Sequence, residues 1–116
     1  MAVSPIYVHD GKLLRVIEDN RHSRLMMEVE LPILDRGEEL EARQLVFEDV
    51  RHYHIAEGAI EGPPTLLDMT IVGQEGRHTK VRLDTTAGYR EFLCSAVRVE
   101  PAAPPNPAPR FPFDET

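Results

Sequence analysis

Aromatic residues and cysteine are scarce in this sequence. Its 116 residues include no tryptophan, four phenylalanines, three tyrosines and one cysteine. So few aromatic rings argue against the stacking platforms on which single-stranded nucleic acids bind. The one cysteine, Cys94, excludes a disulfide within the chain and favours a reducing compartment. It lies in the apolar run "REFLCSAVRV", so we expect a small core residue and not an exposed nucleophile.

Long apolar runs are also missing. No stretch approaches the roughly 20 apolar residues that span a bilayer. The opening residues "MAVSPIYVHDGKLLRV" do not combine a basic start with a long apolar segment, as a secretion signal does. We therefore expect a soluble protein of the cytoplasm.

Basic residues are outnumbered by acidic ones, 13 against 20, which gives a net charge of −7. This charge repels nucleic acids and anionic membranes on average. Residues 35–62 are strongly acidic, with eight acids and three bases, whereas residues 77–98 carry five bases and two acids. We expect the two regions to pair with each other or to be solvated. The alternative is a nucleic-acid patch formed by Arg77, Lys80, Arg82, Arg90 and Arg98.

Alternation of apolar and polar residues is the dominant pattern, and it predicts half-buried strands. In "SRLMMEVEL" it places four apolar side chains on one face: Leu25, Met27, Val29 and Leu31. In "TLLDMTIVG" it does the same for Leu67, Met69 and Ile71. Glycine, proline and Asp-Gly turns separate the runs. The predicted strands are 12–18, 23–31, 43–48, 50–55, 65–72, 78–85 and 89–99.

These elements predict an all-β fold, mainly an antiparallel sheet in the form of a sandwich or a strongly curved sheet, with about seven strands. At most one short helix is expected, a helical turn at residues 37–42. Residues 1–100 are expected to form a single antiparallel domain. Residues 101–116 contain six of the ten prolines and form a proline-rich tail. The tail is either flexible or docked through Phe111 and Phe113 on the domain or on a second subunit.

The segment "DVRHYHIAEG" contains the most distinctive candidate site. His52 and His54 are two residues apart, so on a regular strand both side chains leave the same face, as a metal-binding pair requires. On the same reading Val50 shares their face, and Tyr53 takes the other. A metal would need a third ligand, for which the candidates are His9, Asp49, Glu57 and His78. The favoured interpretation is a solvated or partner-facing strand.

Catalytic motifs are absent from the sequence. Ser4, Ser23 and Ser95 lie in no nucleophile-elbow motif. The stretch from Gly73 to Gly76 lacks the lysine and helix of a phosphate-binding loop. We therefore expect no catalytic residue and no cofactor, and a protein that is not an enzyme. The alternative is a metal-binding protein or metal-dependent enzyme that uses His52 and His54.

The order of three segments, "HDGKLLRV", "RLMMEVEL" and "LVFEDVRHY", resembles that of small bacterial β-rich domains that begin with an HD pair. The resemblance covers residues 7–55. Some members of such families look like immunity proteins, which bind and neutralise a toxin. Here Gly11 stands where a serine often follows the pair, and the proline-rich tail is not part of the pattern. The resemblance carries over no catalytic residue.

These observations together predict a non-catalytic module that binds a protein partner. A homodimer through an edge strand or through the tail is also expected. The acidic charge favours a basic partner surface. The predicted contact residues are Glu38, Glu39, Glu41, Asp49, His52 and His54.

Overall fold

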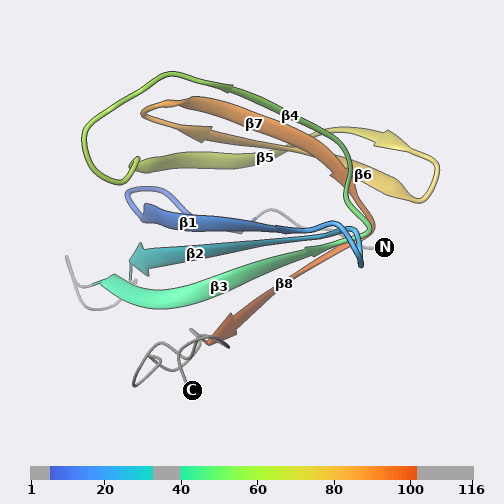
Figure 1. The fold of residues 1–116 in the computed structure, drawn as a ribbon, viewed down its shortest axis with the longest axis horizontal. Helices are drawn as coiled ribbons and strands as arrows, with labels where there is room; N and C mark the ends of the chain where they lie inside the picture. Colours follow the sequence, from blue (N-terminus) through green and yellow to red (C-terminus); the bar gives the residue numbers. More distant parts are fainter. Residues whose placement is uncertain (1–5, 33–39, 102–116) are drawn as a thin grey trace, which may run out of the picture.

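The structure, a computed structural model, describes residues 6–32 and 40–101. It is an all-β sandwich of eight antiparallel strands, as predicted (Figure 1). The first sheet has the order β1-β2-β3-β8 and comprises β1 (Lys12–Asp19), β2 (Arg24–Pro32), β3 (Leu40–Glu48) and β8 (Ala96–Pro101). The second has the order β4-β7-β6-β5 and comprises β4 (Arg51–Glu57), β5 (Leu66–Glu75), β6 (His78–Thr85) and β7 (Gly88–Cys94).

The two sheets share one corner, where the chain passes between them twice. β3 continues into β4 after Asp49 and Val50, and β7 continues into β8 after Ser95. The Ser95 amide donates a hydrogen bond to the Glu48 carbonyl oxygen at 3.0 Å, which holds the two crossings together. The predicted strand 89–99 is therefore two strands, which accounts for eight strands in place of seven.

The predicted helical turn at 37–42 is wrong for its last three residues. β3 begins at Leu40 and pairs in unbroken register with β2. Its partner strand provides hydrogen bonds along the whole length, and this outweighs the helix propensity of the segment. Residues 37–39, which include the predicted contact residues Glu38 and Glu39, lie outside the described residues, as does the tail after Pro101.

The core lies between the sheets and follows the predicted alternation. Leu25, Met27, Val29 and Leu31 of β2 are all buried. The ring of Phe47 packs edge-on against Phe92 of the opposite sheet, with 4.8 Å between ring centroids. Cys94 is fully buried, as predicted, and burial raises the pKa of its thiol to about 11. The described part of the chain has no helix of the length and apolarity needed to cross a bilayer.

Three of the four edge strands contain β-bulges. The register shifts by one residue in β1 between Leu13 and Arg15, in β4 between Arg51 and His54, and twice in β5. The first bulge of β5 explains why Leu66 is buried and Leu67 is exposed, contrary to the predicted alternation. Met69 is buried as predicted, while Ile71, in regular register with Met69, is exposed. The pairing of β8 with β3 shows no shift.

The edges of β1 and β5 meet over a short stretch. The Leu66 amide donates to the Gly11 carbonyl at 2.8 Å, and the Leu13 amide donates to the Pro64 carbonyl at 3.0 Å. Lys12 and Thr65 form an isolated bridge at the same place. This contact closes one side of the sandwich near the start of β1. No described strand pairs with the outer side of the later part of β1.

Candidate functional site

The bulge in β4 arranges the predicted histidine site. Arg51 pairs with Leu93 and His54 with Glu91, so β4 contains one residue more than its partner strand. His52 takes a positive φ of 55°, and Tyr53 turns inward to pack edge-on against Phe92. His52 and His54 both remain exposed.

Both histidines line one open hollow on the outer face of the second sheet. The hollow has a volume of about 330 Å³ and is lined further by Glu75, Lys80, Glu91, Phe92 and Leu93. Val50 does not share this face, contrary to the sequence-based interpretation, since it packs against the core as Tyr53 does. The extra residue of the bulge changes the alternation between Val50 and Tyr53.

The four candidate third ligands of a metal are engaged elsewhere. Asp49 accepts hydrogen bonds from His78 and Arg51, and Glu57 binds Arg90. His9 bonds through its Nδ1 to the Leu67 carbonyl oxygen at 2.9 Å. Within residues 6–32 and 40–101 no group of three or more His, Cys, Asp or Glu side chains is placed to hold a metal ion. Metal binding at His52 and His54 stays a prediction, and no third ligand among the described residues supports it.

Asp49 stabilises the corner between the sheets through hydrogen bonds to Arg51 and His78. It lies between β3 and β4 with a positive φ of 53°, and its carboxylate accepts hydrogen bonds from His78 Nε2 at 2.9 Å and Arg51 Nε at 3.2 Å. The hydrogen bond from His78, followed by that from Arg51, lowers the pKa of the Asp49 carboxyl below its ordinary value. Asp49 therefore has a structural role within the chain. Its contacts with His78 and Arg51 do not depend on a binding partner.

The lowered pKa of Asp49 predicts a pH-dependent contribution to stability. Because the folded pKa is below the unfolded value of about 3.9, the contribution is present above pH 4 and is lost as the pH falls through the folded pKa. We expect Asp49→Asn to lower the free energy of unfolding at pH 6 by more than at pH 2.5. Urea denaturation of both proteins at the two pH values measures this difference. An equal loss at both would contradict the assignment.

A second cluster, formed by Tyr53, Glu57 and Arg90, lies on the inner face of the second sheet. Arg90 binds Glu57 through two hydrogen bonds of 2.7 Å each, from Nε and Nη2. Its Nη1 donates to the Tyr53 hydroxyl at 2.6 Å. The side chains of Arg90 and Glu57 are only 15% and 13% exposed. Burial raises the pKa of the Tyr53 phenol, against the opposing effect of Arg90.

Sequence reasoning missed this cluster, although one signal was available. In "GYREFLC" Arg90 has the same parity as Phe92 and Cys94, both of which are buried. A charged residue at an inward position requires a buried partner. The identity of that partner was not readable, because Glu57 is 33 residues away in the chain.

Arg90 also lines a hollow between the sheets. This hollow has a volume of about 350 Å³ and is lined further by Leu13, Leu14, Arg15, Val16, Glu18 and Pro64. Of the five N–H groups of the guanidinium, three bond to Glu57 and Tyr53 in the described part of the chain. The hollow thus combines apolar and charged side chains with a fixed, partly buried cation, Arg90.

Removing the charge of Glu57 is expected to destabilise the protein. Glu57→Gln leaves Arg90 without its counter-ion in a partly buried place, which we expect to cost about 2 kcal/mol, less than for a fully buried pair. The matched control is Glu28→Gln, which breaks the exposed pair with Arg15 and should cost under about 0.5 kcal/mol. Chemical denaturation of the two variants measures both. An equal loss of unfolding free energy in the two variants would show that burial does not strengthen the Glu57–Arg90 interaction.

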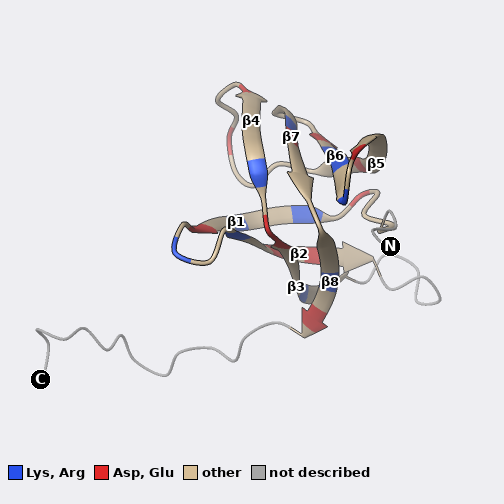
Figure 2. Ribbon diagram, turned by 90° about the vertical axis from the view of Figure 1, so that its right-hand side faces the viewer, with Lys and Arg blue, Asp and Glu red and all other residues tan. Residues whose placement is uncertain are grey.

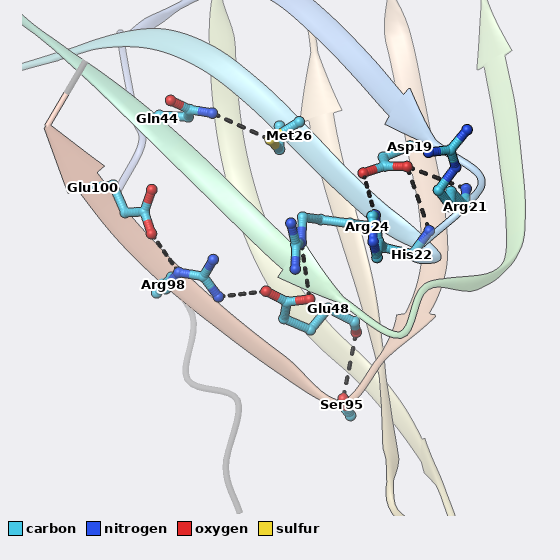
Figure 3. Close-up of polar contacts among 10 residues, drawn as sticks. All are labelled: Asp19, Arg21, His22, Arg24, Met26, Gln44, Glu48, Ser95, Arg98 and Glu100. Atoms are coloured by element: carbon cyan, nitrogen blue, oxygen red, sulfur yellow. Dashed lines mark hydrogen bonds and ion pairs between the residues drawn. The ribbon is translucent and has the colours of Figure 1, made fainter. Parts of the chain in front are cut away.

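Charge pairing extends over both outer faces. Arg82 lies over the ring of Tyr89, 3.9 Å from its centroid, and binds Asp84 at 2.9 Å. Arg98 binds Glu48 and Glu100 on the first sheet (Figure 3). Figure 2 shows basic and acidic positions interspersed on the strands of both sheets. The predicted pairing between the acidic and basic regions is confirmed by Glu57–Arg90 and Glu48–Arg98.

Among the predicted contact residues that the structure describes, Glu41 lies apart from Asp49, His52 and His54. Glu41 is exposed near the start of β3 and pairs with Arg43 at 2.6 Å. Asp49 lies eight residues further along the chain, roughly 25 Å away on an extended strand. Asp49, His52 and His54 lie in one short segment, while Glu38 and Glu39 lie outside the described residues.

No protein-family model, curated protein or solved structure matches this chain at a significant level. The resemblance of residues 7–55 to immunity-like β-rich domains therefore stays a prediction.

Proposed function

We propose that this chain is a non-catalytic protein-binding module whose contact surface centres on β4. The observation that carries the proposal is a pair of exposed apolar side chains beside the Arg90 hollow. Ile55 is 45% exposed and is the register partner of Arg90. Leu14 is 46% exposed and lines the hollow together with Arg90. Exposed apolar side chains around a fixed polar group are typical of anchor points in protein interfaces.

The position of β4 supports this assignment. β4 is an edge strand of the second sheet, and no described strand pairs with its outer side. From His54 to Glu57 its register with β7 is regular, so a short extended segment of a partner can add to it. Alternate side chains of that segment would meet His54 on the outer face and Ile55 on the inner face.

The chemistry of the partner follows from charge. The net charge of −7 favours a protein with a basic contact surface, mainly by speeding association. The resemblance to immunity-like domains implies a toxin as the class of partner. A single buried thiol suits the reducing cytoplasm, where we propose that the module acts.

Affinity capture with matched variants tests the proposal. Ile55→Asp should weaken capture of a saturable partner at least about tenfold, the loss of about 1.4 kcal/mol of binding energy. Val72→Asp is the control, because Val72 is equally exposed, at 46%, but lies on β5. Circular dichroism checks that both variants fold. Equal capture by all three proteins, or no saturable partner, would contradict the proposal.

A further inference from the structure

β8 is the one edge strand among the described strands without a bulge. Its six residues pair with β3 in continuous register, from Ala96 opposite Glu48 to Pro101 opposite Arg43. Bulges are a common means of preventing edge-to-edge pairing. β1 and β5 contain them, and the bulge of β4 limits its regular edge to the short stretch from His54 to Glu57. In Figure 1 β8 is the outermost strand of the first sheet. Among the strands that the structure describes, none pairs with this edge, so it can accept a further strand.

Pro101 defines which main-chain groups of β8 point outward. Proline has no N–H, so the Arg43–Pro101 pair is not a hydrogen-bonded pair of the ladder. Hydrogen-bonded and non-hydrogen-bonded pairs alternate, so Arg98 and Glu100 bond to β3. The N–H and C=O groups of Val97 and Val99 consequently face away from β3.

The side chains of β8 are self-complementary about Val99. In an antiparallel pair of two β8 strands centred on Val99, each Arg98 lies opposite Glu100 of the second copy. Val99, which is 44% exposed, lies opposite its own equivalent. This arrangement gives about four main-chain hydrogen bonds, two between the Val99 residues and one from each Val97 to Pro101. Centring the pair on Arg98 gives as many bonds but places Arg98 opposite Arg98, which is unfavourable.

We infer that β8 binds β8 of a second copy of this chain across a two-fold axis at Val99. The two first sheets then join into one continuous sheet. Arg98 retains Glu48 within its own chain and gains Glu100 of the other copy, since both carboxylates lie on the same outer face (Figure 3). The contact is small, so the dimer is weak and forms at high protein concentration. β4 lies in the other sheet and has no part in it.

Cysteine cross-linking of the full chain tests the register. Two Val99 residues in a hydrogen-bonded antiparallel pair have Cα atoms about 5.5 Å apart, a distance that a disulfide spans. With oxidised glutathione, Val99→Cys should form a covalent dimer at least about tenfold faster than Val72→Cys. The control has the same exposure, and Cys94 is buried in both variants. Equal rates would overturn the inference.

Sedimentation equilibrium tests the dimer without cross-linking. The wild-type chain should form a dimer whose fraction rises with protein concentration and is detectable by about 1 mM. Val99→Pro should abolish it, because the N–H that it removes points away from β3 and the monomer keeps its own ladder. Ile55→Asp should leave it unchanged, which separates this inference from the proposed function. A wild-type chain that is monomeric at 1 mM, or an unaltered dimer in Val99→Pro, would refute it.

Discussion

Gly88→Ala is expected to destabilise the protein by about 4 kcal/mol. Gly88 begins β7 with a φ of +144°, and a Cβ at this position would lie 2.0 Å from the Ala56 carbonyl oxygen and 2.9 Å from the Glu57 Cα. Backbone strain of this kind costs about 1–3 kcal/mol, and steric overpacking adds about 1–3 kcal/mol. Both contacts are with backbone atoms of β4, so relief requires that β4 and β7 separate.

Gly58→Ala is the matched control for this prediction. Gly58 follows β4 directly, and a Cβ built there meets no atom within 4 Å. The substitution should be neutral or stabilise the protein by up to about 1 kcal/mol, since alanine restricts the unfolded chain. Urea denaturation of both variants measures the difference. A Gly88→Ala protein as stable as Gly58→Ala would show that β4 and β7 do not approach as closely as the structure has them.

Phe47→Ala is expected to cost about 3–5 kcal/mol. Phe47 is 1% exposed, and its ring packs edge-on against Phe92, whose ring packs in turn against Tyr53. These three rings connect the first sheet to the second and to the edge strand β4. Truncation therefore removes a large buried surface and leaves a cavity where the sheets meet.

The Phe47 prediction is measured by thermal and urea denaturation. Val72→Ala on the exposed part of β5 is the control and should change the free energy of unfolding by under about 0.5 kcal/mol. A double-mutant cycle with Phe92→Ala should give a coupling of about 0.5–1.5 kcal/mol for the ring pair. No coupling, or a cost under 1 kcal/mol for Phe47→Ala, would contradict the packing described here.

The contrast between β2 and β5 explains how far the strands could be predicted. β2 itself contains no bulge, because the extra residue in its pairing with β1 lies in β1, so the inward positions Leu25 to Leu31 follow from parity alone. β5 contains two extra residues, and these leave Leu67 and Val72 exposed although both are apolar. Gly73 is a residue type that often marks a bulge, but which residue of the segment is extra is defined by the strand opposite.

The candidate site shows the same division. His52 and His54 were recognisable from their spacing, and they are exposed on β4. The Arg90–Glu57–Tyr53 cluster was not, because its members come from β4 and β7, which two other strands separate in the chain.

An antiparallel β architecture with a buried Cys94 and internally paired charges could be inferred from residue order. Such features depend on side-chain period, composition and turn chemistry, which are local properties of a chain. The break at Ser95, the bulge at His52, the hollow beside Arg90 and the open regular edge of β8 depend on the folded molecule. Each arises from the position of a strand distant in sequence, and residue order alone does not specify that position.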